Sequence, residues 1–234
     1  SHTVLGGLGA ARYCQVVHGW DWFHPLYGAV LAALIAALVI GLVGMKARQR
    51  EDTVIGALWA VGMAAGILFI SRTPGYSEDL MSYLFGSILM VSAGDLWLIA
   101  GLDLFVVVVA ALFYNQFLAV CFDEEFARLR GVRVEGFYLL LLCMTALTVV
   151  LLVTVVGIIM VIAIITLPAA VAGEFTKRLW HMMLLSALLT VAFTTAGLAL
   201  SYGPDLPAGA TIIAVAGTVY LASVVGVRLF RLKR

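Results

Sequence analysis

Seven long apolar runs are the feature that most constrains how this chain can fold. A helix needs about 20 residues to cross the hydrocarbon of a bilayer, and each run approaches or reaches that length. The chain is 64% hydrophobic and 12% charged, whereas a soluble domain carries about 25% charged residues. A water-soluble fold of 234 residues could not bury this much apolar surface, so we expect the chain to lie in lipid.

The runs should form helices, because lipid offers no hydrogen-bond partners to exposed backbone groups. The strands of a membrane barrel would alternate polar and apolar residues, and these runs do not. We expect full spans at about 26–44, 53–71, 97–118, 137–155, 156–172, 180–201 and 207–227. The predicted fold class is therefore all-α: a polytopic membrane helix bundle of about seven full spans, forming one transmembrane domain over residues 1–234.

The first apolar stretch, at about 3–17, is too short to cross and follows a polar pair of residues. A charged amino terminus is costly inside a bilayer. We therefore expect a partial N-terminal helix whose first half, together with at least one further helix, lies upstream, so that the chain is N-terminally truncated.

Lysine and arginine residues gather in alternate loops, and this pattern predicts the orientation. Twelve of the fourteen basic residues lie in the segments 46–50, 128–133, 177–178 and 228–234. We expect these segments, and with them the C-terminus, on the cytoplasmic side of a multi-pass protein of the cell (inner) membrane. The opposite loops then face outward, and residues 78–90 of the longest one read as a short helix at the interface.

Several classes of function are disfavoured by what the sequence lacks. The net charge of +1 favours no nucleic-acid or acidic partner. The chain has no Gly-Lys-Ser/Thr phosphate loop, so we do not expect it to hydrolyse ATP or to act as an enzyme. Cys14, Cys121 and Cys143 are isolated thiols without metal-ligand spacing, and we expect no permanently bound cofactor.

Residues 121–136 hold seven charged side chains between two apolar runs. Asp123 suits the N-cap of a short helix, and Glu124 and Glu125 would follow in its first turn, where the helix dipole favours acidic groups. Gly131 suits the position just after the helix, where a left-handed backbone costs glycine least. The pattern predicts a short helix with both ends capped.

One face of this helix should be apolar. Phe122, Phe126 and Leu129 fall at i, i+4 and i+7, the spacing of a single stripe. A connector that only enforced topology would need neither the caps nor the stripe, although a plain solvated connector is the alternative reading. We therefore expect an amphipathic helix that docks onto a cytoplasmic partner.

The chain resembles the permease subunits of ATP-binding-cassette (ABC) importers for the divalent metals zinc, manganese and iron. Those permeases carry a cytoplasmic helix of the form F-D-x-E-x-A-x-x-x-G, which here reads FDEEFARLRG over 122–131. Further segments similar to the family lie at 1–10, 80–90, 156–172 and 205–221, in the same order. The resemblance therefore extends over nearly the whole chain.

The resemblance implies that the helix in 121–136 is a coupling helix that seats in a groove of a separate ATPase subunit. The residues implied for this coupling are Phe122, Asp123, Glu124, Glu125, Phe126, Ala127, Leu129 and Gly131. It further implies a homodimer, cytoplasmic ABC ATPase subunits and an extracytoplasmic metal-binding protein as partners. The function implied is import of Zn²⁺, Mn²⁺ or Fe²⁺ into the cytoplasm by alternating access at the homodimer interface.

In this family the pore helix carries D-x-x-S-H, and its Asp and His line the translocation path. His2 matches the His, whereas the Asp would precede Ser1. Imidazole and carboxylate suit these metals, and imidazole makes zinc the first choice among them. The family's hairpin helix also implies that Pro168 kinks the helix over 156–172.

Two further sets of residues have open interpretations. His18, Asp21 and His24 lie in an outward loop, where they could receive metal at the pore mouth or belong to an ordinary interfacial loop. Asp103 lies early in an apolar run, where it could face the pore or bond to a neighbouring helix.

Two alternative functions are a gradient-driven secondary metal transporter and a membrane scaffold subunit without a substrate. The first would need ionisable groups near the middle of several spans, and His2 and Asp103 are the only candidates in the sequence. The second predicts a partner other than an ATPase for the helix in 121–136.

Overall fold

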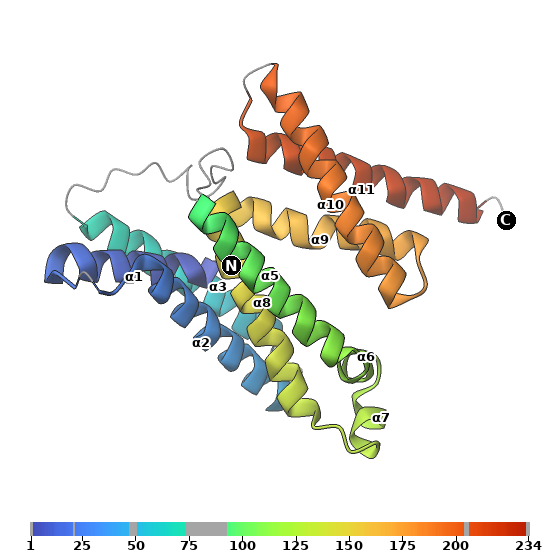
Figure 1. The fold of residues 1–234 in the computed structure, drawn as a ribbon, viewed down its shortest axis with the longest axis horizontal. Coiled ribbons are helices and arrows are strands. Elements are labelled where there is room, and N and C mark those ends of the chain that lie inside the picture. Colours follow the sequence, from blue (N-terminus) through green and yellow to red (C-terminus); the bar gives the residue numbers. More distant parts are fainter. Residues whose placement is uncertain (1, 21, 47–50, 74–92, 204–205, 233–234) are drawn as a thin grey trace. The chain divides into compact units, whose positions relative to one another are not determined.

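The computed structural model describes residues 2–20, 22–46, 51–73, 93–203 and 206–232. Within these ranges every regular element is a helix (Figure 1), as the apolar runs predict. The elements are α1 (His2–His18), α2 (Pro25–Lys46), α3 (Glu51–Arg72), α5 (Ala93–Leu112), α6 (Tyr114–Phe122), α7 (Glu124–Leu129), α8 (Val134–Val156), α9 (Ile158–Phe175), α10 (Leu179–Tyr202) and α11 (Ala208–Leu232).

Six helices are long and apolar enough to cross a membrane. They are Pro25–Met45, Asp52–Arg72, Val134–Val156, Ile158–Phe175, Leu179–Tyr202 and Ala208–Gly226. Each corresponds to one of the expected spans, so the all-α membrane fold is confirmed. The short helix expected at 78–90 lies outside the described residues.

The span expected at 97–118 is bent in the structure. The chain bends by 73° between the helical stretches Ile99–Leu112 and Tyr114–Phe122, and Phe113 lies at the break. The rings of Phe113 and Phe117 both pack against Phe137 of α8, with centroid separations of 5.4 and 6.0 Å. A hydropathy pattern could not predict these contacts of Phe113 and Phe117 with α8, because they join residues distant in sequence.

The chain divides into two compact units, and the boundary falls late in α8. The first unit contains α1, α2, α3, α5, α6, α7 and most of α8, and the second contains the end of α8 with α9, α10 and α11. That residues 1–234 act as one permease domain stays a prediction.

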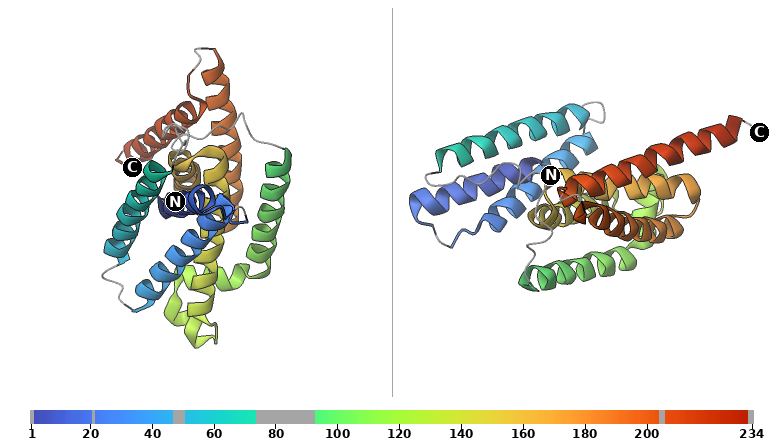
Figure 2. Two further views of the ribbon diagram at one scale, coloured as in Figure 1. Left: turned by 90° about the vertical axis from the view of Figure 1, so that its left-hand side faces the viewer. Right: turned by 90° about the horizontal axis from the view of Figure 1, so that it is seen from above.

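In the first unit, α1 packs along both α2 and α3 (Figure 2). Glycines bring the backbones together: a Cβ added to Gly6 would lie 2.8 Å from the carbonyl oxygen of Gly62, and one added to Gly9 would lie 2.8 Å from that of Gly66. On the other side of α1, Gly7 meets the backbone of Gly28. Small residues at such spacings let membrane helices approach closely, so α1 is held tightly on two sides.

In the second unit, α9 packs against α10 and α11, which also pack against each other. Gly157 separates α8 from α9 with a φ of 79° and a ψ of 164°, a conformation that is nearly exclusive to glycine. The predicted boundary between two spans at 155–156 is therefore confirmed. Pro168 lies buried inside α9, which continues without a break to Phe175; the expected kink stays a prediction.

Candidate functional site

Asp123 begins α7 as the sequence predicts. Its backbone is extended, with a φ of −154°, and its side chain accepts a hydrogen bond from the backbone N–H of Phe126 at 3.0 Å. Glu124 and Glu125 occupy the first turn, where the partial positive charge of the helix end favours them. The N-terminal cap and the placement of the two glutamates are confirmed.

The C-terminal end of α7 is closed by a Schellman motif around Gly131. Gly131 has a φ of 78°, its N–H donates to the carbonyl of Arg128 at 3.0 Å, and the N–H of Val132 donates to the carbonyl of Ala127 at 3.0 Å. This pair of bonds satisfies carbonyls that the short helix leaves open. The prediction that Gly131 follows the helix in a left-handed conformation is confirmed.

The predicted single apolar stripe needs a correction. Phe122 is the last residue of α6, and the extended backbone of Asp123 separates it from α7. The three apolar side chains are nevertheless open to the surroundings: Phe122 is 80% exposed, Phe126 49% and Leu129 87%. Arg130 lies over the ring of Phe126, 4.8 Å from its centroid. The segment therefore presents an uncovered apolar surface bordered by an arginine.

The opposite face of α7 is anchored. Ala127 is fully buried in a small apolar cluster with Val120 of α6 and Val134 of α8, and Phe137 and Tyr138 pack around this cluster. An alanine at this point lets α7 lie close to both neighbouring helices. The short helix thus combines an exposed apolar face with a buried attachment.

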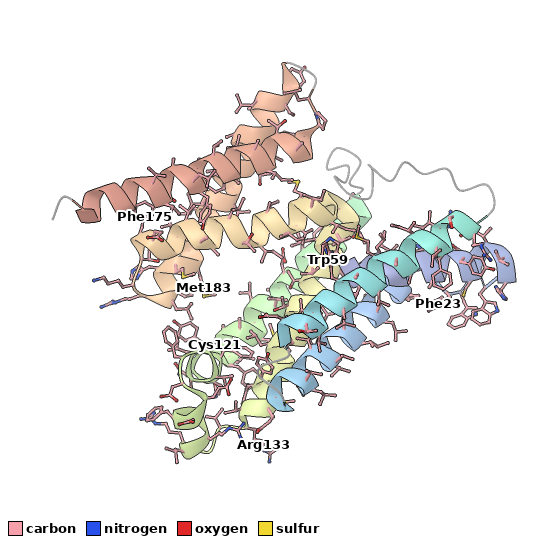
Figure 3. All side chains as sticks on the ribbon, turned by 180° about the vertical axis from the view of Figure 1, so that it is seen from behind. Phe23, Trp59, Cys121, Arg133, Phe175 and Met183 are labelled. Carbon is pink, nitrogen blue, oxygen red and sulfur yellow. The ribbon has the colours of Figure 1, made fainter. Side chains whose placement is uncertain are left out.

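His2 lies at the start of α1, against α3. Its ring meets that of Trp59 edge-on, with centroids 5.3 Å apart and planes inclined by 81°. Both residues line a cavity of about 230 Å³, whose other lining residues are Thr3, Ala36, Ile40, Ile55 and Leu58. Figure 3 shows Trp59 on α3. Within this mostly apolar cavity, imidazole is the metal-ligating group.

His18 and His24, which the sequence predicts in an outward loop, make local contacts. The ring of His18 lies between those of Tyr13 and Trp20, at 5.9 and 6.0 Å, and Nδ1 of His24 accepts a hydrogen bond from the N–H of Leu26 at 3.3 Å. Asp21 lies outside the described residues, so the proposed set of three at the pore mouth stays a prediction. In the part of the chain that the structure describes, no three His, Cys, Asp or Glu residues gather as metal ligands.

Asp103 is exposed on α5. The sequence leaves open whether Asp103 faces the pore or bonds to a neighbouring helix, and both interpretations stay predictions.

Three contacts of this unit were missed by the sequence reasoning. The close approach at Gly62 and Gly66 had a signal, since they form a G-x-x-x-G spacing. The contact of Trp59 with His2 had no signal in the sequence. Neither did the ion pair between Arg128 and Glu135, because these residues belong to different helices.

Comparisons with known proteins agree with the motifs. Residues 1–226 match the model of the ABC 3 transport family. The chain is 45% identical over 223 residues to an uncharacterized membrane protein of Synechocystis sp., covering 95% of this chain and 77% of that protein. It is 37% identical over 221 residues to the manganese transport system membrane protein MntC of Halalkalibacterium halodurans, covering 94% of this chain and 73% of that protein.

A solved structure shares the fold. PsaBC from Streptococcus pneumoniae, solved in complex with Fab, superposes with a TM-score of 0.81 at 27% identity, covering 100% of this chain and 84% of that chain. The resemblance to ABC metal permeases stated from the motifs is thereby confirmed. The chain is a multi-pass membrane protein that belongs to the ABC 3 transport family.

Proposed function

We propose that this chain is the permease subunit of an ATP-driven importer that moves Mn²⁺, or a closely related divalent metal, into the cytoplasm. As a member of the ABC 3 transport family it is a transport component rather than an enzyme, and ATP hydrolysis falls to a separate subunit. The observation that carries the proposal is α7, which is capped at both ends, anchored on one face and apolar on the other.

The surface around α7 supports the docking of an ATPase. Arginine-rich loops are typical of the cytoplasmic side, and the presence of Arg128, Arg130 and Arg133 in this segment supports a cytoplasmic position for α7. Phe126 and Leu129 would then be exposed to water rather than to lipid. Fully burying an exposed side chain of this kind contributes about 1.5–3 kcal/mol. Leu129 is 87% exposed and Phe126 49%, so a groove that receives both would gain more from Leu129 than from Phe126.

The choice of metal rests on the relatives and on His2. Imidazole alone makes zinc the first choice, but a relative that is 37% identical is named as a manganese transport protein, and this favours Mn²⁺. A histidine in a mostly apolar cavity is a sparse ligand set. Such a set binds a cation weakly enough to release it, as transport requires.

A homodimer would add metal ligands from a second copy of the chain. Since the described part of the chain brings together no three metal ligands, a path between two copies would gain a second His2. Alternating access at that interface, driven from α7 and supplied by an extracytoplasmic metal-binding protein, completes the proposed cycle. In this orientation the C-terminus is cytoplasmic, together with the basic segment 228–234.

The test is Mn²⁺ uptake into vesicles that contain this chain and its ATPase. Uptake should require ATP and should stop when the catalytic glutamate of the ATPase is replaced by Gln. Parallel uptake measurements with Zn²⁺ or Fe²⁺ supplied outside the vesicles in place of Mn²⁺ identify the preferred metal. Uptake at an undiminished rate without any nucleotidase would refute the proposal and would indicate a gradient-driven carrier.

A further inference from the structure

The coupling segment contains an ion pair that joins two helices. Arg128, in the last turn of α7, places Nη2 2.7 Å from Oε1 of Glu135, in the first turn of α8. Each charge also suits its own helix, because basic groups are favoured at a C-terminus and acidic groups at an N-terminus. The two side chains are 55% and 50% exposed, so the pair adds little to global stability.

Two further connections between α7 and α8 are compact and lie close to the chain itself. The chain passes from one helix to the other through residues 130–133, which include the left-handed Gly131. Ala127 touches the beginning of α8 through the apolar cluster with Val134. The linker at 130–133 can therefore act as a hinge, and the cluster around Ala127 holds α7 beside it.

A cavity lies beside the pair. It has a volume of about 300 Å³ and is lined by Arg128 and Glu135 with Glu124, Val134, Tyr138 and the end of α2 at Gly44 and Met45. Close-packed atoms would resist a rotation of α7 toward this side, but a cavity does not. The ion pair at its edge is therefore a contact that opposes such a rotation.

We propose that Arg128 and Glu135 are positioning residues that make α8 follow α7 when the ATPase moves it. This inference rests on the proposed function, and it assigns a role to an ion pair distinct from Phe126 and Leu129, the apolar side chains proposed for docking. With the pair intact, α7 and the first turn of α8 move together. Without it, α7 can turn about the hinge at 130–133, and a larger share of the ATPase cycles fail to move α8.

The test compares Arg128→Gln, Glu135→Gln and the double variant in vesicles with the ATPase. Arg133→Gln is the matched control, because it removes a positive charge from the same exposed segment (Figure 3) without breaking the pair. Arg128→Lys keeps the charge. Three quantities are measured for each variant: retention of the ATPase on purification, the rate of ATP hydrolysis, and the Mn²⁺ transported per ATP.

An exposed ion pair shifts an equilibrium by about two- to fivefold. We therefore expect Mn²⁺ transported per ATP to fall about two- to fivefold in each single Gln variant, with ATPase retention and hydrolysis near those of the wild type. The double variant should fall no further, because the two residues act as one unit. Arg128→Lys should keep most of the coupling, and Arg133→Gln should keep all of it.

Several results would overturn this inference. An unchanged ratio in both single variants would show that the pair transmits nothing. Losses that add in the double variant would show two independent roles, and a parallel loss of ATPase retention would show that the pair serves docking. Wild-type uptake that does not depend on ATP would instead refute the proposed function itself, and this inference with it.

Discussion

The contact of α1 with α3 predicts that Gly62 tolerates no side chain. A Cβ at this position would lie 2.6 Å from Cα and 2.8 Å from Cγ2 of Thr3, whereas carbon atoms pack best at about 3.5–4.0 Å. The two helices would have to separate by about 1 Å to accept Gly62→Ala. Such overpacking costs about 1–3 kcal/mol, and the separation would also loosen the contact of Gly66 with Leu5.

Gly56 supplies a matched control on the same helix. A Cβ added there meets nothing within 4 Å, so Gly56→Ala should be neutral or slightly stabilising, since alanine is a better helix former than glycine. The assay is thermal unfolding of the purified protein in detergent, followed by the intrinsic fluorescence of its five tryptophans. For a chain of this size, 1–3 kcal/mol corresponds to a fall in melting temperature of about 2–12 °C.

The same variants test whether the packing positions the candidate site. Because Thr3 follows His2 directly, displacement of α1 by Gly62→Ala should also lower Mn²⁺ uptake, whereas Gly56→Ala should leave it unchanged. Equal melting temperatures for the two variants would refute the reasoning, since they would show that α1 and α3 do not pack through these glycines.

Three further predictions concern α7 and the candidate path. Asp123→Ala should cost about 0.5–2 kcal/mol of local helix stability and weaken ATPase retention on purification, whereas Asp123→Asn, which still accepts the bond from Phe126, should retain it; equal retention would contradict the role of the cap. Phe126→Asp should detach the ATPase while leaving the melting temperature near wild type, and a stable complex would show that the partner binds elsewhere. His2→Ala should lower Mn²⁺ uptake without lowering ATPase retention, whereas His18→Ala, at the other end of α1, should change neither; equal uptake in the two variants would remove His2 from the path.

The agreement at the spans has a local cause. Hydropathy over about 20 residues decides whether a segment enters lipid, so runs such as 180–201 predicted their helices without knowledge of any neighbour. The ends of α7 were predictable for a similar reason. Asp123 and Gly131 act on backbone groups only a few residues away, and those groups are visible in the sequence.

The misplacement of Phe122 and the unforeseen bend at Phe113 have different causes. An N-cap residue has a non-helical backbone, so the prediction of Asp123 as a cap already excluded Phe122 from the same helix. The bend at Phe113 is different, because it accompanies the packing of Phe113 and Phe117 on Phe137. The hydropathy of residues 97–118 carries no information about Phe137, because that residue lies on a different helix.

The amino-acid sequence alone determined that this protein lies in lipid, which of its segments are membrane helices, and where the capped ends of α7 lie. Each of these depends on side chains that act within one or two turns of their own helix. The tertiary structure alone decided that His2 meets Trp59, that Gly6 and Gly62 bring two backbones together, and that Arg128 reaches Glu135. These contacts join separate helices, and their geometry depends on how the helices pack rather than on any spacing along the chain.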